Sequence, residues 1–181
     1  MLGPGIGKST IAASLFTKMK ELGYSAELAS EYAKELVYEK SYDKMKDQVY
    51  LLGKTFHKLY SLKNNVDFVI SDSPLLLSMI YFKYNNMQQI IDESTFHKFT
   101  YELHKSFGDN QLNILLKRDK NIKFENKARI HNENESNIIQ DNIEIMLKDL
   151  NEKYYVITNT FGDTEITRNQ IMRLMKVNGL L

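Results

Sequence analysis

Apolar side chains recur at helical spacing along much of the chain. Between residues 8 and 22 the apolar positions Ile11, Leu15 and Met19 lie on one face of a helix, and Gly23 follows where a helix C-cap is expected. The first helix should therefore end just before Gly23. Similar patterns predict further helices over residues 32–39, 44–65, 74–84, 92–107, 135–150 and 166–177.

Short apolar runs separate these helical segments and have the length of strands. The runs cover residues 25–29, 66–72, 112–116 and 154–157. Strands that alternate with helices predict βαβ units, and therefore a parallel sheet with helices on both faces. In such a sheet, ligands bind at the carboxyl ends of the strands.

Composition limits the range of architectures and partners. A length of 181 residues with 43% hydrophobic content predicts one domain over residues 1–181 with a substantial core. A net charge of +1 argues against a nucleic-acid partner. The absence of cysteine excludes disulfides and thiolate metal sites and is typical of the cytoplasm, where we expect the protein. No apolar run approaches the roughly 18 residues that a membrane helix needs.

The start of the chain matches the phosphate-binding pattern G-x-x-x-x-G-K-[ST], except that Leu2 replaces the first glycine. Glycines let the backbone approach a polyphosphate closely and turn its N–H groups inward. Lys8 would then reach the β/γ-phosphates, and the Ser9 hydroxyl would bind Mg²⁺. We interpret the segment as a P-loop that binds a nucleoside triphosphate, with a simple glycine turn as the alternative. The segment comprises Gly3, Pro4, Gly5, Ile6, Gly7, Lys8, Ser9 and Thr10.

In proteins with this loop, a hydrophobic strand in the middle of the sheet precedes it. Here only Met1 and Leu2 stand before the glycines, which is too short for a strand of about 5 residues. We therefore expect that the first strand is missing from the given sequence. If the chain is complete, either a partner fills that position or nucleotide binding is weak.

Two acidic residues end predicted strands and should lie at the same edge of the sheet as Lys8. Glu31 follows the strand at 25–29, and Asp72 ends the strand at 66–72. Phosphoryl transfer needs a group that accepts the proton of the attacking hydroxyl and a carboxylate that holds magnesium. We predict the first role for Glu31 and the second for Asp72. The alternative is that each residue only caps the helix that follows it.

The stretch at 117–134 lacks periodicity and is rich in basic residues. Such a segment is typical of a lid that closes over phosphates and supplies guanidinium groups to the transition state. We chose Arg118 and Arg129 for this role because the chain has only four arginines. The alternative is an exposed loop that is basic by chance.

The acceptor side of the site is less well defined by the sequence. Gln48 begins a predicted helix, and its amide could read the edge of a base or sugar, although surface polarity explains it equally well. Tyr32 could stack on a ring or could simply belong to the core. The four histidines are scattered without metal-ligand spacing, so we predict no metal beyond Mg²⁺.

These motifs together resemble a group of small P-loop proteins. The resemblance rests on the loop itself, on Glu31 to Glu35 (EYAKE), on Asp47 with Gln48, on Ser71 to Leu75 (SDSPL), and on the two lid arginines. Many members are phage-borne and described as AAA-type ATPases. They are related to the ribosylnicotinamide kinase domain and, more distantly, to nucleoside and nucleotide kinases. The resemblance implies an α/β/α fold with strand order 2-3-1-4-5, ATP as donor, Mg²⁺ and a small acceptor.

Three functions remain open from the sequence. The first is a kinase that transfers phosphate from ATP to a nucleoside-like or nucleotide-like acceptor, and it leaves room for a homodimer. Ser73 stands where many nucleotide kinases have arginine, which weakens the version with a monophosphate acceptor. The second is an ATPase or nucleotide-dependent switch that acts on a macromolecule, although no second acid follows Asp72 to activate water. The third is a degenerate protein without turnover.

Overall fold

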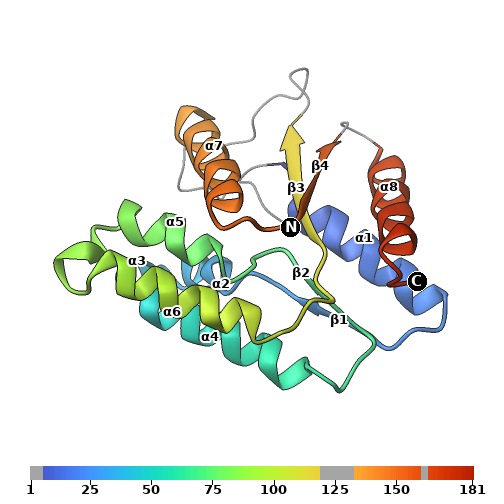
Figure 1. The fold of residues 1–181 in the computed structure, drawn as a ribbon, viewed down its shortest axis with the longest axis horizontal. Helices are drawn as coiled ribbons and strands as arrows, with labels where there is room; N and C mark the ends of the chain where they lie inside the picture. The colour runs from blue at the N-terminus through green and yellow to red at the C-terminus, as the bar shows by residue number, and fades with distance from the viewer. Residues whose placement is uncertain (1–5, 119–132, 160–162) are drawn as a thin grey trace.

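The computed structural model describes residues 6–118, 133–159 and 163–181, with helices and strands in alternation (Figure 1). For Arg118 and Glu133 the structure describes the backbone but not the side chain. The elements are α1 (Lys8–Glu21), β1 (Ala26–Ala29), α2 (Tyr32–Tyr38), α3 (Tyr42–Lys46), α4 (Gln48–Leu62), β2 (Phe68–Ser71), α5 (Leu77–Tyr84), a 3₁₀ turn (Met87–Gln89), α6 (Glu93–Lys105), β3 (Asn113–Arg118), α7 (Glu133–Asp149), β4 (Tyr154–Asn159) and α8 (Thr164–Val177).

The four strands form two parallel pairs. Residues Ala26–Ala29 of β1 align with Phe68–Ser71 of β2, and Asn113–Arg118 of β3 align with Tyr154–Asn159 of β4. These pairs match the neighbours expected as strands 2-3 and 4-5 of the predicted order. Within the described residues the two pairs are separate sheets, so the complete predicted order is not established.

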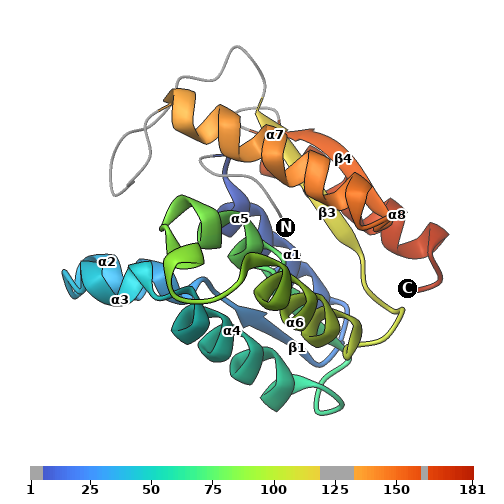
Figure 2. The ribbon, with the colours of Figure 1, turned by 60° about the vertical axis from the view of Figure 1, so that its left-hand side comes forward.

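Helices cover both faces of the strands, as the alternation of elements predicted. The side chains of β3 show this directly, because Ile114 and Leu116 pack in one core cluster with α1 and α8, whereas Leu115 packs in another with α5 and α7. A third cluster joins α4, α5 and α6. Figures 1 and 2 show α1 beside α8 on one side of the strands, with α4 to α7 on the other. The protein is therefore a mixed α/β fold with three layers.

The helix expected at 44–65 is divided at Asp47. The backbone of Asp47 is extended, with ψ at 91°, and the Asp47 carboxylate accepts a hydrogen bond from the Tyr50 backbone N–H at 2.9 Å. This is the geometry of a helix N-cap, which satisfies a backbone donor that the first turn leaves unpaired. The chain before Asp47 forms the short helix α3 instead. The predicted helix at 74–84 is also shorter, because Pro74 lies in a turn and α5 begins at Leu77.

The lid was predicted to begin at residue 117, and this boundary was wrong. Lys117 and Arg118 are the last residues of β3 and align with Thr158 and Asn159 of β4. The Lys117 ammonium lies 2.6 Å from the carboxylate of Glu144 on α7, so the two residues form a salt bridge. Arg129 and the rest of the lid up to residue 132 lie outside the described residues.

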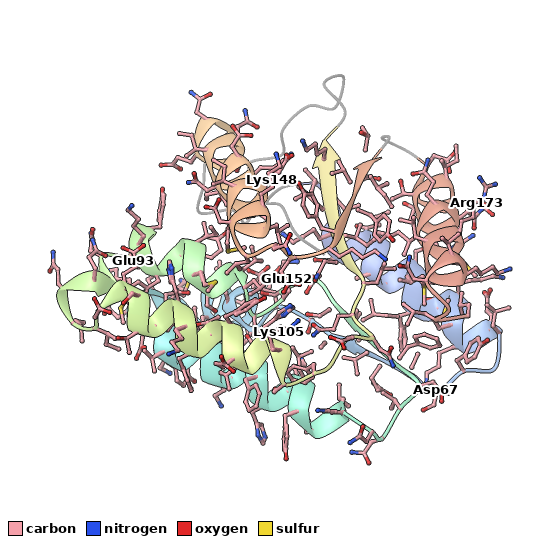
Figure 3. The ribbon with its side chains drawn as sticks, viewed as in Figure 1. Asp67, Glu93, Lys105, Lys148, Glu152 and Arg173 are labelled. Carbon is pink, nitrogen blue, oxygen red and sulfur yellow. The ribbon has the colours of Figure 1, made fainter. Side chains whose placement is uncertain are left out.

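The ladder between β1 and β2 begins at a side-chain contact. Asp67, labelled in Figure 3, precedes β2 and its carboxylate accepts a hydrogen bond from the Ser25 backbone N–H at 2.8 Å. The backbone N–H of Asp67 donates in turn to the Ser25 carbonyl at 2.8 Å. These bonds fix the register in which both strands run toward Glu31 and Asp72.

No helix within the described parts of the chain has the length and apolar character required to span a membrane.

Candidate functional site

The end of the glycine-rich loop leads directly into α1. Gly7 is the N-cap of this helix and has φ of +80°, a left-handed conformation that glycine adopts without strain. The Ile11 backbone N–H donates to the Gly7 carbonyl at 3.0 Å, which starts the helix at Lys8. The N–H groups in the first turn of an α-helix have no acceptor within the helix itself, so the start of α1 is suited to binding an anion. Gly3, Pro4 and Gly5 lie outside the described residues.

Ser9 and Asp72 are in direct contact, as expected if they share a metal. The Ser9 hydroxyl donates a hydrogen bond of 2.6 Å to Oδ2 of Asp72, which is only 2% exposed. The other carboxylate oxygen, Oδ1, is buried without a hydrogen-bond partner among the described residues. An orphaned anionic oxygen in a buried site is costly unless a cation or donor satisfies it.

This arrangement fits a magnesium ion. Mg²⁺ prefers hard oxygen ligands and commonly takes one carboxylate and one hydroxyl together with phosphate oxygens. Ser9 Oγ and the carboxylate of Asp72 offer both types on adjoining elements. When bound, the ion would neutralise charge on the phosphates of a nucleotide.

Lys34 also belongs to this cluster, and sequence reasoning assigned it no role. Its ammonium donates to Ser9 Oγ and lies 3.9 Å from Oδ2 of Asp72. Lys34 lies three residues after Glu31, so it shares that face of α2. The spacing within EYAKE was the signal that could have identified it. Lys34 thus competes with a metal ion for Ser9 Oγ, whereas Oδ1 of Asp72 stays open to a cation.

A cavity of about 570 Å³ extends from the phosphate loop across α2, α3, α4 and α5. Residues from the P-loop and from the predicted acceptor side line it together, which makes one connected space. This volume is in the range of small-molecule sites. The lining residues with predicted roles are Ile6, Gly7, Lys8, Ser9, Thr10, Glu31, Tyr32 and Gln48.

Glu31 stands at the N-cap position of α2, but its side chain makes no capping hydrogen bond to the described backbone. The alternative prediction, that the Glu31 carboxylate only caps α2, is therefore not supported by the described contacts. Glu31 instead faces the cavity, which Tyr81 on α5 also lines. Burial, and secondly the negative charge of Glu31, raise the pKa of Tyr81. Tyr81 thus remains a neutral phenol beside a carboxylate, and the sequence pattern alone gave no indication of it.

Tyr32 is held by a second tyrosine. The hydroxyl groups of Tyr32 and Tyr50 are 2.8 Å apart, and their rings meet edge to face at a centroid distance of 5.9 Å. The Lys54 ammonium lies over both rings, at 5.5 and 5.7 Å from their centroids. The hydrogen bond with Tyr50, aided by burial, raises the pKa of Tyr32 to about 12. Tyr32 is a fixed part of the cavity wall.

Gln48 is buried, with 3% of its surface exposed, so the interpretation as surface polarity was wrong. Its amide Nε2 donates to the Met45 carbonyl at 3.0 Å across the junction of α3 and α4. Gln48 lines the cavity as well. The hydrogen bond orients the amide, which leaves its carbonyl oxygen and its second N–H as the groups that a ligand can use.

The arginines differ in how far the structure describes them. The backbone of Arg118 is paired in β3 and Arg129 is outside the described residues. Arg168 on α8 donates to Ser14 Oγ at 3.3 Å and to Glu165 at 3.1 Å, so it ties α8 to α1. Arg173 points away from α8 at the edge of the molecule (Figure 3). The roles predicted for Arg118 and Arg129 stay predictions.

The geometry just described agrees with a comparison of the chain with protein families. The AAA domain family matches residues 3–164, which is most of the chain, so the chain belongs to this family of P-loop nucleotide-binding domains. Such a domain is an NTPase-like enzyme and generally binds ATP together with Mg²⁺. No curated protein matches the chain.

Proposed function

We propose that the protein transfers the γ-phosphoryl group of ATP to a hydroxyl of a small nucleoside-like or nucleotide-like acceptor, with Mg²⁺ as cofactor. The observation that carries the proposal is the single cavity that Glu31 shares with Lys8 and Ser9. A site that only hydrolyses ATP needs room for water, whereas this cavity of about 570 Å³ continues well beyond the loop.

The roles of the residues follow from the chemistry of phosphoryl transfer. The acceptor oxygen attacks the γ-phosphorus while the bond to the β–γ bridging oxygen breaks and ADP leaves. Glu31 accepts the proton of the attacking hydroxyl, and Lys8 neutralises charge on the β- and γ-phosphates. Asp72 and Ser9 hold the metal. Arg118 and Arg129 are proposed to stabilise charge on the transferring group.

The walls of the cavity support an acceptor with a flat ring. Five tyrosines line it, and the amide of Gln48 is available between α3 and α4. Aromatic side chains bind planar rings by stacking, and an oriented amide can read their polar edges. The five tyrosines are Tyr32, Tyr38, Tyr42, Tyr81 and Tyr84.

A second candidate function is an ATPase or nucleotide-dependent switch that acts on a protein or nucleic acid. Membership of the AAA domain family favours it, because ATP hydrolysis is the activity that this family description implies. It predicts slow hydrolysis that a macromolecular partner accelerates and that small acceptors do not.

One experiment separates the two candidates. The protein is incubated with ATP and Mg²⁺ and with a panel of nucleosides and nucleoside monophosphates, and the products are identified by mass spectrometry. The kinase proposal expects an acceptor whose mass rises by one phosphoryl group, with ADP formed in equal amount. If ADP accumulates at one rate whichever compound is present, and none gains phosphate, the kinase proposal is wrong.

A further inference from the structure

The end of β4 is joined to the phosphate loop by a side chain that the proposed chemistry does not use. Asn159 is the last residue of β4, and its amide Nδ2 donates to the backbone carbonyl of Ile6 at 2.7 Å. Its Oδ1 accepts a hydrogen bond from the Thr167 hydroxyl at 3.0 Å. Thr167 lies on α8 and is only 1% exposed. Both polar atoms of the Asn159 amide are thus committed to fixed partners.

The bond to Ile6 controls the direction of a neighbouring N–H group. The carbonyl of Ile6 and the N–H of Gly7 belong to one planar peptide unit, and in a trans peptide these two groups point in opposite directions. When Asn159 holds the carbonyl on its side, the Gly7 N–H must point the other way. Ile6 and Gly7 both line the cavity, so this N–H belongs to the loop that is expected to bind phosphate.

The packing around Gly7 shows how closely this contact is built. A Cβ atom placed on Gly7 would lie 2.8 Å from Nδ2 of Asn159, closer than real Cβ atoms approach a nitrogen. Gly7 also has φ of +80°. The glycine therefore serves two purposes, because it permits the left-handed turn and leaves space for the asparagine amide.

We propose that Asn159 and Thr167 are positioning residues that orient the Ile6–Gly7 peptide for nucleotide binding. Thr167 fixes which way the asparagine amide faces, since its hydroxyl donates to Oδ1 and leaves Nδ2 for the Ile6 carbonyl. Arg168, the next residue, anchors the same turn of α8 to Ser14 on α1. The affinity for a nucleotide then depends on the start of α8. The inference rests on the proposed binding of a nucleotide by this loop, but not on which acceptor is used.

The decisive variant is Asn159→Asp. It has nearly the same shape and still accepts the bond from Thr167, but it places a carboxylate oxygen against the Ile6 carbonyl where a donor stood. Loss of this partly buried hydrogen bond together with the repulsion should weaken the binding of Mg-ATP at pH 8 by at least about 10-fold. The dissociation constant is measured by isothermal titration calorimetry, with the midpoint of thermal unfolding recorded in parallel.

The pH dependence of this variant separates orientation of the peptide from general stability. A carboxyl that is repelled by a carbonyl oxygen has a raised pKa, and once protonated it regains an O–H donor. The ratio of the variant's dissociation constant to that of the wild type should therefore fall at least about threefold from pH 8 to pH 5. Asp163 and Glu165 at the start of α8, and Arg118, which aligns with Asn159 in the β3–β4 ladder, are unchanged between the two proteins. The ratio therefore reports the effect of the substituted carboxyl.

Matched controls use the other end of α8. Asn178 follows that helix, and its Nδ2 also donates to a backbone carbonyl, that of Leu174, at 2.7 Å. Asn178→Asp makes the same chemical change about 16 Å beyond Thr167 along the helix and should leave the affinity for Mg-ATP within about twofold of the wild type. Thr167→Val should weaken binding by about 3- to 10-fold, and Thr167→Ser should restore it.

The outcomes distinguish the two proposals. If the wild type binds Mg-ATP and folded Asn159→Asp binds equally well at pH 8, the positioning role is wrong while nucleotide binding stands. A loss of affinity that is the same at every pH, or that Asn178→Asp shares, also overturns it. If Asn159→Asp does not fold, the comparison of Thr167→Val with Thr167→Ser decides. A wild type that binds no nucleotide overturns both this inference and the proposed function.

Discussion

At the scale of single residues, the site combines groups whose environments give them different tasks. Asp72 is almost completely buried and contacts Ser9, whereas Glu31 faces the cavity near the neutral phenol of Tyr81. One carboxylate thus lies beside a hydroxyl that could bind the same metal ion, and the other lines the cavity that is proposed to admit the acceptor. This division motivates one prediction for each acid.

Glu31→Gln should lower the rate of phosphoryl transfer by roughly 10²-fold or more, because the amide cannot accept the proton of the attacking hydroxyl. The affinity for Mg-ATP should change little, since Glu31 contacts the acceptor side. Single-turnover assays and calorimetry measure the two quantities separately. Glu35→Gln, an exposed change one turn later on α2, serves as the control. Unchanged turnover in Glu31→Gln would remove the proton-accepting role.

Asp72→Asn should reduce the contribution of Mg²⁺ to ATP affinity. The neutral amide offers one oxygen and no charge, so it is a poorer ligand for a hard divalent cation. We expect ATP affinity with and without Mg²⁺ to differ much less in the variant than in the wild type, as measured by calorimetry. Asp67→Asn at the opposite end of β2 is the matched control, because its carboxylate only accepts a bond from the Ser25 backbone. Equal magnesium dependence in Asp72→Asn and the wild type would argue against the metal site.

At the scale of helices and strands, sequence periodicity predicted most elements but not how side chains connect them. The strand ends that carry Glu31 and Asp72 were predicted from apolar runs, and the same rule applied to β4 would have pointed to Asn159. Lys34 belongs to the EYAKE motif, yet its contact with Ser9 depends on how α2 lies relative to α1. Aspartate is a common N-cap residue, so Asp47 could have been predicted to start a helix. The apolar positions keep helical spacing on both sides of Asp47, and this pattern therefore predicted one continuous helix.

Glycine substitutions in two helical contexts should have opposite effects. Gly7→Ala forces a methyl group into the space of the Asn159 amide and requires φ of +80°, so it should abolish measurable nucleotide binding. Gly53→Ala on the exposed face of α4 meets no atom within 4 Å and should stabilise the fold by about 0.5–1 kcal/mol. Urea unfolding and calorimetry test both. A Gly7→Ala protein that binds ATP normally would contradict the close approach at this loop.

At the scale of the whole molecule, the predicted class of fold is found while the full strand order is not established. Alternating patterns were sufficient to predict layers, because the burial of Ile114 and Leu115 on opposite faces follows from strand geometry. Within the described residues the strands form the pairs β1–β2 and β3–β4, which are the neighbours that the family resemblance implied. The hydrophobic pattern by itself carries no information about which strand edges meet. The extent of the lid was wrong for a related reason: Lys117 is polar but belongs to a strand, where Glu144 pairs with it.

The protein should lose stability as the pH falls below neutrality, partly through His104. This residue joins α6 to the segment after α7: its Nε2 lies 3.3 Å from the Glu152 carboxylate, and its side chain is nearly buried. Burial lowers the pKa of His104 from its ordinary value of 6.5, although the charge of Glu152 opposes the shift. The unfolded chain therefore binds a proton near pH 6.5 that the folded protein resists, and the free energy of unfolding decreases below that pH.

Replacement of His104 by glutamine should make the free energy of unfolding less dependent on pH between 7 and 5. Urea unfolding at several pH values measures this slope. The exposed His57→Gln on α4 provides the control and should keep the slope of the wild type. A slope in His104→Gln equal to that of the wild type would show that other groups dominate the acid response.

The tyrosines of the cavity also have an optical consequence. The chain has 11 tyrosines and no tryptophan, and five of the tyrosines line the cavity. Emission excited near 280 nm therefore comes from tyrosine alone, without transfer of energy to an indole. A planar ligand that stacks among these rings should quench a large part of that emission, so the unlabelled protein can report occupancy of this cavity by fluorescence.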